Sequence, residues 1–289
     1  MRLRTLPLSL AGVMLGAFIA ANQQEVTPLT VGLLLVTTAL LQILSNLSNE
    51  LGDTLSGTDN DERQGIHYSL QDGGMSIAQM KWLIIVVACC CCLAGTGMIR
   101  CAFGNLFSAE SILFFLLGAG AIVAATRYTL GKNPYGYRGL GDIFVFIFFG
   151  LVAVGGGYYI CAHNITYWQV LLPGSAIGCF SVGVLNVNNI RDMKSDAATR
   201  TTVAIKLGPH RARIYHTILL AAGWLLMVTF TLLTATSWTA WLYLLALPLH
   251  AKHLHGVWTR QDRALDPMLP LLVLSTFLLA LLAGIGMTI

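Results

Sequence analysis

Residues 168–196 read WQVLLPGSAIGCFSVGVLNVNNIRDMKSD, an apolar run that ends in a polar and acidic segment. The apolar part, 168–187, has about the 20 residues that a helix needs to cross a bilayer. Backbone groups in lipid must bond within their own segment, so this run predicts a membrane-spanning helix. The polar segment then lies at one face of the membrane, and it carries Asn188, Asp192 and Asp196.

The rest of the chain has the same character. Of its 289 residues, 56% are hydrophobic and only 10% are charged, whereas about 25% of residues are charged in a soluble domain. Apolar stretches of bilayer length recur, and the short segments between them hold nearly all the charge. We predict an all-α polytopic membrane protein, a bundle of nine transmembrane helices at about 3–22, 28–46, 82–99, 109–126, 142–162, 168–187, 214–234, 237–250 and 267–288.

The positions of the Lys and Arg residues predict the orientation, because cytoplasmic loops carry an excess of both. If the N-terminus is cytoplasmic, every one of the 17 Lys and Arg residues except Arg100 falls on the cytoplasmic side. We therefore expect a cytoplasmic N-terminus. The net charge of +4 follows from membrane topology and calls for no nucleic-acid partner. His253 and His255 fall in one of the basic cytoplasmic segments, where we expect them to be solvated.

Two polar, acidic clusters follow the second and sixth predicted spans. Within each cluster the residues are spaced by three or four, which places them on one face of a continuing helix. Both clusters lie at cytoplasmic ends of even-numbered spans, so they share one membrane side and a similar depth. Their members are Asn46, Asn49, Glu50 and Asp53 in the first cluster, with Asp59 farther along, and Asn188, Asp192 and Asp196 in the second.

Carboxylates gathered at membrane depth repel one another unless a cation neutralises them, and ionisable groups there mark functional sites. Oxygen ligands without His or Cys suit Mg²⁺, which bridges one or two carboxylates to substrate phosphates. The clusters therefore indicate a site for Mg²⁺ and a diphosphate. The alternative is that each cluster is simply the hydrophilic end of a helix, which is harder to sustain for two similar clusters on one side.

Basic and aromatic residues near the clusters could complete such a site. In the segment 127–142, Tyr128 and Lys132 are four residues apart, so one helical turn would direct both toward the same space. Aromatic faces can stabilise a cation, although tyrosines are also common where a membrane meets water. Arg191 lies inside the second cluster and has a stronger claim to an anion-binding role than Arg200 or Lys206 farther along.

These elements, in this order, resemble the UbiA-type intramembrane prenyltransferases over most of the chain. The family pattern Asn-Asp-x-x-Asp corresponds to Asn49-Glu50-Leu-Gly-Asp53, where Glu50 keeps the charge but has a longer side chain. A Tyr-x-x-x-Lys element corresponds to Tyr128–Lys132, and a second Asp-x-x-x-Asp motif to Asp192–Asp196. Within the family, the strings Asn133–Asp142 and Asn188–Asp192 are most similar to the subgroup that prenylates 1,4-dihydroxy-2-naphthoate in menaquinone biosynthesis.

The resemblance implies a single transmembrane prenyltransferase domain over 1–289. The recurrence of an acidic cluster after the second and again after the sixth predicted span, four helices apart, indicates two related halves, roughly 1–126 and 127–289. The resemblance also implies a Mg²⁺-dependent transferase in the bacterial inner membrane, opening to the cytoplasm and acting on a polyprenyl diphosphate and an aromatic acid. Asp53, Asp192, Asp196, Lys132 and Tyr128 would be catalytic. The implied metal ligands are Asn49, Glu50, Asp53, Asp59, Asp192 and Asp196; the implied diphosphate-binding residues are Lys132, Arg191, Arg200 and Lys206; and Arg127 and Arg138 are candidates for binding the acceptor.

Three alternatives remain open on the sequence. Another aromatic acceptor, such as 4-hydroxybenzoate or homogentisate, would need the same chemistry. A secondary transporter also places ionisable groups near membrane depth, typically where an inverted repeat has broken helices at the midplane. A purely structural role would leave both acidic clusters without a reason.

Overall fold

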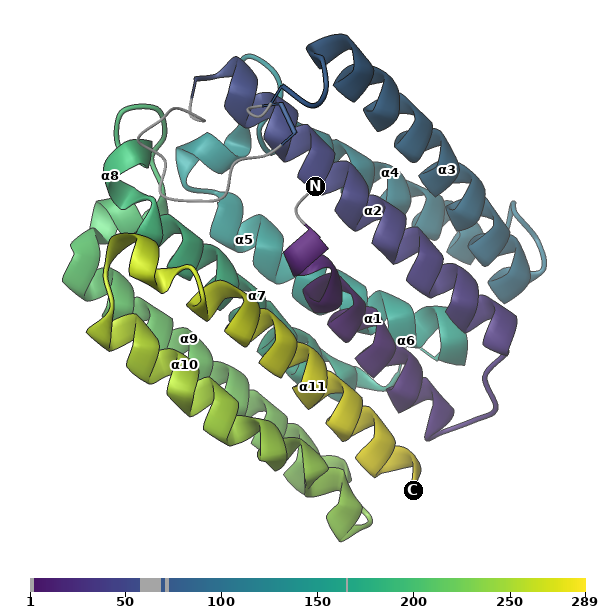
Figure 1. Cartoon of the computed structure of the whole chain (residues 1–289). Coiled ribbons are helices and arrows are strands. Elements are labelled where there is room, and N and C mark those ends of the chain that lie inside the picture. The colour runs from purple at the N-terminus through teal and green to yellow at the C-terminus, as the bar shows by residue number, and fades with distance from the viewer. Residues whose placement is uncertain (1–2, 58–68, 71–72, 165) are drawn as a thin grey trace.

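The computed structural model describes residues 3–57, 69–70, 73–164 and 166–289, and every regular element in these ranges is a helix (Figure 1). This confirms the predicted all-α class. The longer helices are α1 (Leu6–Ala21), α2 (Pro28–Leu55), α3 (Ile77–Phe103), α4 (Ala109–Arg127), α6 (Ala153–Ala162), α7 (Leu171–Arg191), α9 (Val203–Thr234), α10 (Leu247–Thr259) and α11 (Met268–Thr288). The shorter elements are η1 (Leu3–Thr5), η2 (Tyr135–Arg138), α5 (Gly141–Val145), η3 (Phe146–Val152), η4 (Trp168–Val170), α8 (Met193–Asp196), η5 (Trp238–Ala246) and η6 (Asp262–Leu265).

The predicted spans coincide with these helices. Seven helical segments of the described chain are long and apolar enough to cross a membrane. One of them, Gly141–Ala162, joins α5, η3 and α6 into a continuous span. The two other predicted spans correspond to α1, which has 16 residues, and to η5 followed by α10. The chain is therefore a multi-pass membrane protein, and its cytoplasmic N-terminus stays a prediction.

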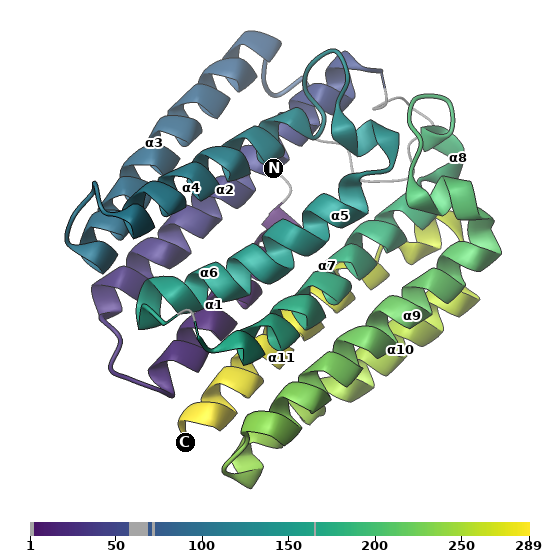
Figure 2. The same ribbon diagram turned by 180° about the vertical axis from the view of Figure 1, so that it is seen from behind.

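Helix α1 lies at the centre of the bundle, packed against α2, α6, α7 and α11. The approach to α6 is very close, because a Cβ atom on Gly16 would collide with the backbone of Val154 and Tyr158. Seen from behind, the span α5–α6 lies between α4 and α7 (Figure 2). Buried apolar residues of α1, α6, α7, α9 and α11 form the main core.

A π-helix, η3, interrupts the span between α5 and α6. Such wide turns in a helix are rare and occur often at functional sites. Gly150 at its middle allows close contact with α7, where a Cβ atom would meet Gly174 and Gly178. This segment thereby forms one wall of the interior cavity described below, with Phe148, Phe149 and Val152 among the residues that line it.

The two acidic clusters sit in different backbone settings. Helix α2 continues about two turns beyond the predicted end of its span to Leu55, so the whole first cluster up to Asp53 is helical. The second cluster is not on one continuous helix. Helix α7 ends at Arg191, Asp192 caps it with non-helical backbone angles, and the single turn α8 follows.

The expectation that His253 is solvated is wrong. Helix α10 continues to Thr259 and carries His253 into the core, where the side chain is fully buried. Its Nε2 atom lies 2.9 Å from Nε2 of His216, and its Nδ1 atom lies 2.9 Å from the carbonyl oxygen of Met268. His255, two positions on, is exposed as expected.

Candidate active site

The acidic residues of α2 point in two directions. Asp53 is 1% exposed and accepts a hydrogen bond of 2.9 Å from the hydroxyl of Tyr137. Glu50 is equally buried, and its carboxylate accepts a hydrogen bond of 3.1 Å from the backbone N–H of Leu70. The helix therefore directs Asp53 toward η2, and it directs Glu50 toward the segment that follows α2.

The carboxylate of Asp192 is fully buried and held by its chain neighbour. Arg191 donates from Nε to Oδ1 at 2.8 Å and from Nη2 to Oδ2 at 2.6 Å. The third nitrogen of the same guanidinium, Nη1, donates to Asp266 at 2.7 Å, just before α11. Asp266 also pairs with Arg4 at 3.0 Å. This chain of charges ties the end of α7 to the N-terminal segment and to the segment just before α11.

Arg200 brings the two acidic clusters together. Its Nη2 atom lies 2.6 Å from Oδ1 of Asp196, and its Nη1 atom lies 3.9 Å from Oδ1 of Asp53. The guanidinium also lies over the ring of Tyr137, 5.6 Å from its centroid. Burial by itself would lower the pKa of Arg200, but the Asp53 and Asp196 carboxylates outweigh it and raise the pKa above its ordinary value. Arg200 is therefore a permanent cation between the clusters.

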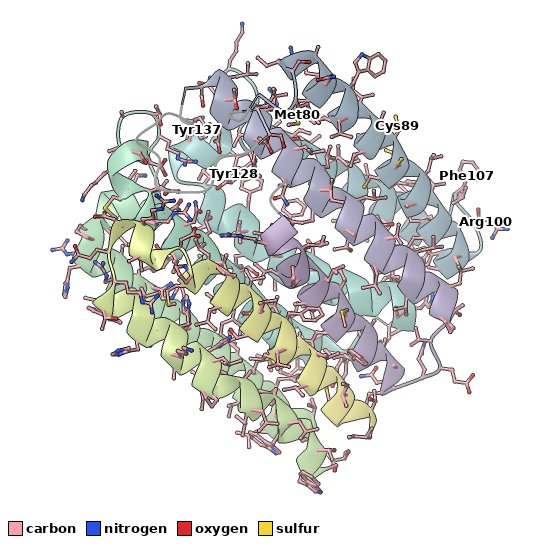
Figure 3. The ribbon with its side chains drawn as sticks, in the orientation of Figure 1. Met80, Cys89, Arg100, Phe107, Tyr128 and Tyr137 are labelled. Carbon is pink, nitrogen blue, oxygen red and sulfur yellow. The ribbon has the colours of Figure 1, made fainter. Side chains whose placement is uncertain are left out.

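Tyr137 connects three parts of this end of the bundle. Besides Asp53, its hydroxyl contacts Ser56 at 2.8 Å, and its carbonyl oxygen accepts a hydrogen bond of 2.9 Å from the N–H of Thr201. Figure 3 shows Tyr137 and Tyr128 at the same end of the molecule. Through these contacts η2 fixes the end of α2 relative to the segment that carries Arg200.

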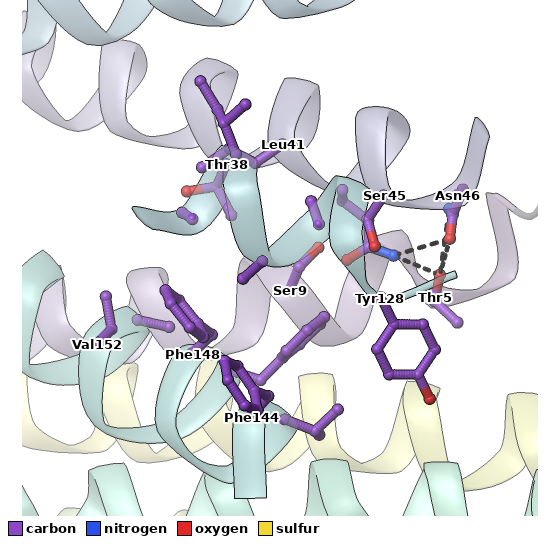
Figure 4. A pocket seen from close by; sticks show the side chains of 18 of the residues that line it. Thr5, Ser9, Thr38, Leu41, Ser45, Asn46, Tyr128, Phe144, Phe148 and Val152 are labelled. Atoms are coloured by element: carbon purple, nitrogen blue, oxygen red, sulfur yellow. Dashed lines mark hydrogen bonds between the residues drawn. The ribbon is translucent and has the colours of Figure 1, made fainter. Parts of the chain in front are cut away.

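A cavity of about 1000 Å³ opens from this polar end into the apolar interior. Its wall is made by residues of α1, α2, α3, α4, α7 and the span α5–α6 (Figure 4). Near the clusters the lining is polar, with Asn49, Asp53, Asn188, Arg191 and Arg200. Deeper in the bundle it becomes mostly apolar, as Leu34, Phe114, Phe148, Val152 and Ile160 illustrate.

Aromatic rings form a row along one wall of the cavity. Tyr128 meets Tyr135 edge-on at 5.3 Å between ring centroids, Tyr135 stacks on Phe144 at 4.1 Å, and Phe144 stacks on Phe148 at 6.3 Å. All four residues line the cavity. The faces and edges of such rings offer contact to a flat ligand or to a carbon cation.

The residues predicted for the site lie in different settings. Asn49, Asp53, Tyr128, Arg191 and Arg200 line the cavity, whereas Asp192 and Asp196 are buried behind Arg191 and Arg200. Asp59 lies outside the described residues. Lys132, Lys206, Arg127 and Arg138 are exposed and absent from the cavity lining, and Glu50 is buried away from it. The catalytic and binding roles of all these residues stay predictions.

The expected helical turn from Tyr128 to Lys132 is absent. Helix α4 ends at Arg127, and Gly131 has a φ of 103°, in the left-handed region that a helix cannot use. Tyr128 therefore faces the cavity, while Lys132 is exposed.

Sequence reasoning also missed residues. Asp266 stands alone between Pro267 and Leu265, with no neighbouring signal of function. Tyr137 lies in the string Asn133–Asp142, which carried the family resemblance. The sequence therefore drew attention to this segment but did not predict the hydrogen bond from Tyr137 to Asp53.

The donor set suits Mg²⁺ better than a softer metal. Asn49 and Asp53 face the cavity with amide and carboxylate oxygens, and two further carboxylates lie behind the arginines. Within the described ranges, no three His, Cys, Asp or Glu side chains converge into a ready-made metal site. That pattern fits an ion held by one or two carboxylates together with substrate phosphate oxygens.

Together, the membrane-spanning bundle and the large cavity with a charged mouth and an apolar interior define an integral membrane protein with an internal amphipathic cavity. A match of residues 9–275 to the model of the UbiA prenyltransferase family then identifies the particular family. The chain belongs to the UbiA prenyltransferase family, and it is a prenyltransferase of that family.

Two relatives resemble the chain over its whole length. A 1,4-dihydroxy-2-naphthoate octaprenyltransferase of Haemophilus influenzae is 41% identical, covering 100% of this chain and 94% of the relative. The enzyme of the same description from Escherichia coli strain K12 is 38% identical, covering 99% and 92%.

Solved structures show the same fold. The apo structure of a UbiA homolog from Aeropyrum pernix superposes with a TM-score of 0.76 at 16% identity, covering 99% of this chain and 98% of that one. A UbiA homolog from Archaeoglobus fulgidus, bound to GPP and Mg²⁺, gives a TM-score of 0.66 at 15% identity, covering 99% of each chain.

Proposed function

We propose that this protein transfers a polyprenyl chain from a polyprenyl diphosphate to 1,4-dihydroxy-2-naphthoate, with loss of CO₂, to give a demethylmenaquinol. The observation that carries the reaction class is the pairing of carboxylates from two helix ends, joined through Arg200, at the mouth of the cavity. The choice of acceptor is supported by the relative of 41% identity, which bears that substrate in its name.

The polar mouth would bind Mg²⁺ and the diphosphate. Asn49 and Asp53 face the cavity and would hold the ion, and Asp192 and Asp196 complete the proposed set. Glu50 belongs to it only if its carboxylate releases the N–H of Leu70 and turns toward the cavity. Asp192 and Asp196 can reach the ion only if Arg191 and Arg200 release them. The two arginines would then bind phosphate oxygens of the substrate instead. When bound, Mg²⁺ would act as a Lewis acid that neutralises the negative charge on the departing diphosphate. Solved family members bound to Mg²⁺ and to prenyl diphosphates support this assignment.

The remaining basic residues of the proposed set lie on the surface. Lys132 and Lys206 are exposed, and the ammonium group of Lys206 lies close to Gly139. From these positions they would attract an anionic head group, since exposed charges steer a ligand toward a site of opposite sign.

Bond making and breaking would follow at the boundary of the polar and apolar parts. The allylic C–O bond of the donor breaks with its electron pair leaving on diphosphate, and the row that begins at Tyr128 and Tyr135 faces the resulting carbon cation. The ring of the acceptor supplies an electron pair to form the new C–C bond at the carbon bearing the carboxylate. The bond to CO₂ then breaks, and its electrons restore the aromatic ring.

The apolar wall has two tasks in this scheme. It holds the isoprenoid chain, and it excludes water that would otherwise capture the cation. Phe144, Phe148 and Val152 lie beyond the aromatic mouth and provide such a wall. We propose that the protein lies in the bacterial inner membrane with the mouth toward the cytoplasm, because nearly all Lys and Arg residues lie at this end of the predicted topology.

The test is radiolabelled prenyl transfer by the purified protein, offered 1,4-dihydroxy-2-naphthoate and a polyprenyl diphosphate with and without Mg²⁺. We expect Mg²⁺-dependent product with release of CO₂, and a loss of about 100-fold or more in Asp53→Asn and Asp192→Asn. Asp262→Asn is the matched control, because Asp262 is 46% exposed and pairs with the exposed Lys194.

Transfer to 4-hydroxybenzoate or homogentisate in place of the naphthoate would retain the reaction class and reject the proposed acceptor. Full activity in both Asp53→Asn and Asp192→Asn would reject the proposed site.

A further inference from the structure

The polar face of α2 extends deeper into the membrane than the proposed metal and diphosphate site requires. From Asp53 the stripe continues through Asn49 and Asn46 to Gln42 and Thr38, at intervals of three or four residues, and all five line the cavity. The rise from Asn49 to Thr38 is about 16 Å. An isoprenoid chain offers no polar group along that distance, so the deeper part of the stripe has another purpose.

Gln42 and Asn46 of this stripe form a hydrogen-bonded triad with Thr5 of η1 (Figure 4). The amide nitrogen of Gln42 donates to Oγ1 of Thr5 at 2.8 Å and to Oδ1 of Asn46 at 3.1 Å. Thr5 and Asn46 contact each other at 3.4 Å. The amides of Gln42 and Asn46 are 5% exposed, so the triad lies inside the protein and on the cavity wall.

Gln42 can offer a polar atom to a ligand. Both hydrogens of its amide nitrogen are used within the triad, and its Oε1 receives no hydrogen bond from any residue that the structure describes. If the amide rotates by half a turn, Oε1 joins the triad and the NH₂ group faces outward, since Thr5 and Asn46 can each donate or accept. Gln42 can therefore accept from a hydroxyl or donate to an oxygen.

The triad and the aromatic row line the same cavity. Thr5, Asn46, Tyr128, Phe144 and Phe148, all labelled in Figure 4, belong to the lining of this cavity. A flat ligand in this space meets hydrogen-bonding groups from α2 and η1, and ring surfaces from the segment that runs from the end of α4 to η3. That combination matches an aromatic ring with hydroxyl substituents and does not match an isoprenoid chain.

We propose that the Thr5–Gln42–Asn46 triad is the acceptor subsite, in which Gln42 accepts a hydrogen bond from a ring hydroxyl of a hydroxylated aromatic acid. This assignment rests on the proposed function. It replaces the hypothesis that Arg127 and Arg138 bind the acceptor, because both arginines are exposed and neither lines the cavity.

The absence of formal charge on the triad is consistent with the reaction. A guanidinium paired with the acceptor carboxylate would stabilise the group that must leave as CO₂. The triad orients the ring through its hydroxyl group and leaves the carboxylate unclamped. Gln42 is thus a positioning residue, since it acts on the ring before any bond forms.

The experiment measures steady-state kinetics with each substrate varied in turn, for Gln42→Leu and Thr5→Val. We expect the KM for the acceptor to rise about tenfold in Gln42→Leu, which corresponds to the loss of one hydrogen bond of about 1.4 kcal/mol, while the KM for the donor stays within about twofold. Thr5→Val should raise the acceptor KM less, because it removes one hydrogen-bond partner of the Gln42 amide but keeps the amide itself.

Thr30→Val is the matched control. It makes the same chemical change as Thr5→Val, but at a buried threonine of α2 whose hydroxyl donates to Sγ of Cys101 and which does not line the cavity. Gln42→Glu serves as a second variant for the chemistry, since it keeps the shape of the side chain and places a negative charge beside the acceptor, which should raise the acceptor KM further.

An unchanged acceptor KM in Gln42→Leu, in protein that transfers prenyl groups to the naphthoate, would overturn the subsite and leave the proposed function intact. If wild-type protein uses a different hydroxylated aromatic acid, the proposed function fails. The subsite is then judged by the same KM comparison with that acid, and a rise confined to the acceptor supports it.

Discussion

Replacement of Arg200 tests the centre of the site directly. Arg200 is 7% exposed and separates the carboxylates of Asp53 and Asp196, which are 2% and 0% exposed. Arg200→Gln keeps a polar side chain but removes the cation, which leaves the two buried acids without their shared counter-charge. Removal of one partner of a buried ion pair costs about 3–5 kcal/mol, so we expect the free energy of unfolding to fall by that amount.

The measurement is denaturation of the detergent-solubilised protein, followed by tryptophan fluorescence, with Lys194→Gln as the control. Lys194 is 83% exposed and pairs with Asp262 at 3.1 Å on the surface, where an ion pair contributes about 0–1 kcal/mol. Equal stability of the two variants would refute the reasoning, because Arg200 could not then be the buried counter-ion of both clusters.

The sign of the pH effect follows from the raised pKa of Arg200. A cation whose pKa is higher in the folded state stabilises the fold below its unfolded pKa and loses that effect only as the pH rises through the folded value. Because both values lie above the range in which proteins are studied, the gap in stability between wild type and Arg200→Gln should not close as the pH is raised from 7 to 9.

Three further predictions concern separate parts of the fold. Tyr137→Phe removes the hydroxyl that donates to Asp53, and we expect kcat/KM to fall about tenfold with little loss of stability, as steady-state assays beside thermal unfolding would show. Gly156 lines the cavity, and a Cβ atom there would lie in ordinary contact with the ring of Phe114, so Gly156→Val narrows the cavity. The rate with long polyprenyl diphosphates should then fall roughly tenfold more than the rate with geranyl diphosphate in a competition assay; an equal fall would place the chain elsewhere. Gly16→Ala forces a methyl group against the backbone of Val154 and should lower the unfolding free energy by about 1–3 kcal/mol or more, whereas an unchanged value would contradict the close approach of α1 and α6.

Features of local origin could be predicted from the sequence. Each apolar run of bilayer length is a helix because its backbone has no other partner in lipid. The residues Asn46–Asp53 share a helix because nothing in that stretch breaks one. Spacing therefore correctly predicted that Asn49 and Asp53 would face the same cavity.

Features that depend on distant partners could not be predicted. His253 is buried because its two ring nitrogens have partners in the core, namely His216, 37 residues away, and the carbonyl oxygen of Met268. The sequence around His253 indicates neither partner. Lys132 was expected beside Tyr128 because four residues make a helical turn, but Gly131 takes a left-handed conformation and ends that relation. For His253 the tertiary setting decided the outcome, whereas for Lys132 the local backbone at Gly131 overrode the helical spacing.

Arg191 and Arg200 can contribute both to membrane orientation and to the chemistry of the site. Arg191 and Arg200 count among the positive charges at the predicted cytoplasmic side, and charge alone assigns them no further role. The structure buries both and pairs each with an aspartate of the second cluster. A charge that only fixed orientation would remain solvated, because burial of an ion is costly without a partner. Their burial is therefore an argument for function, and it separates them from Arg127 and Arg138, which have the same charge and remain exposed.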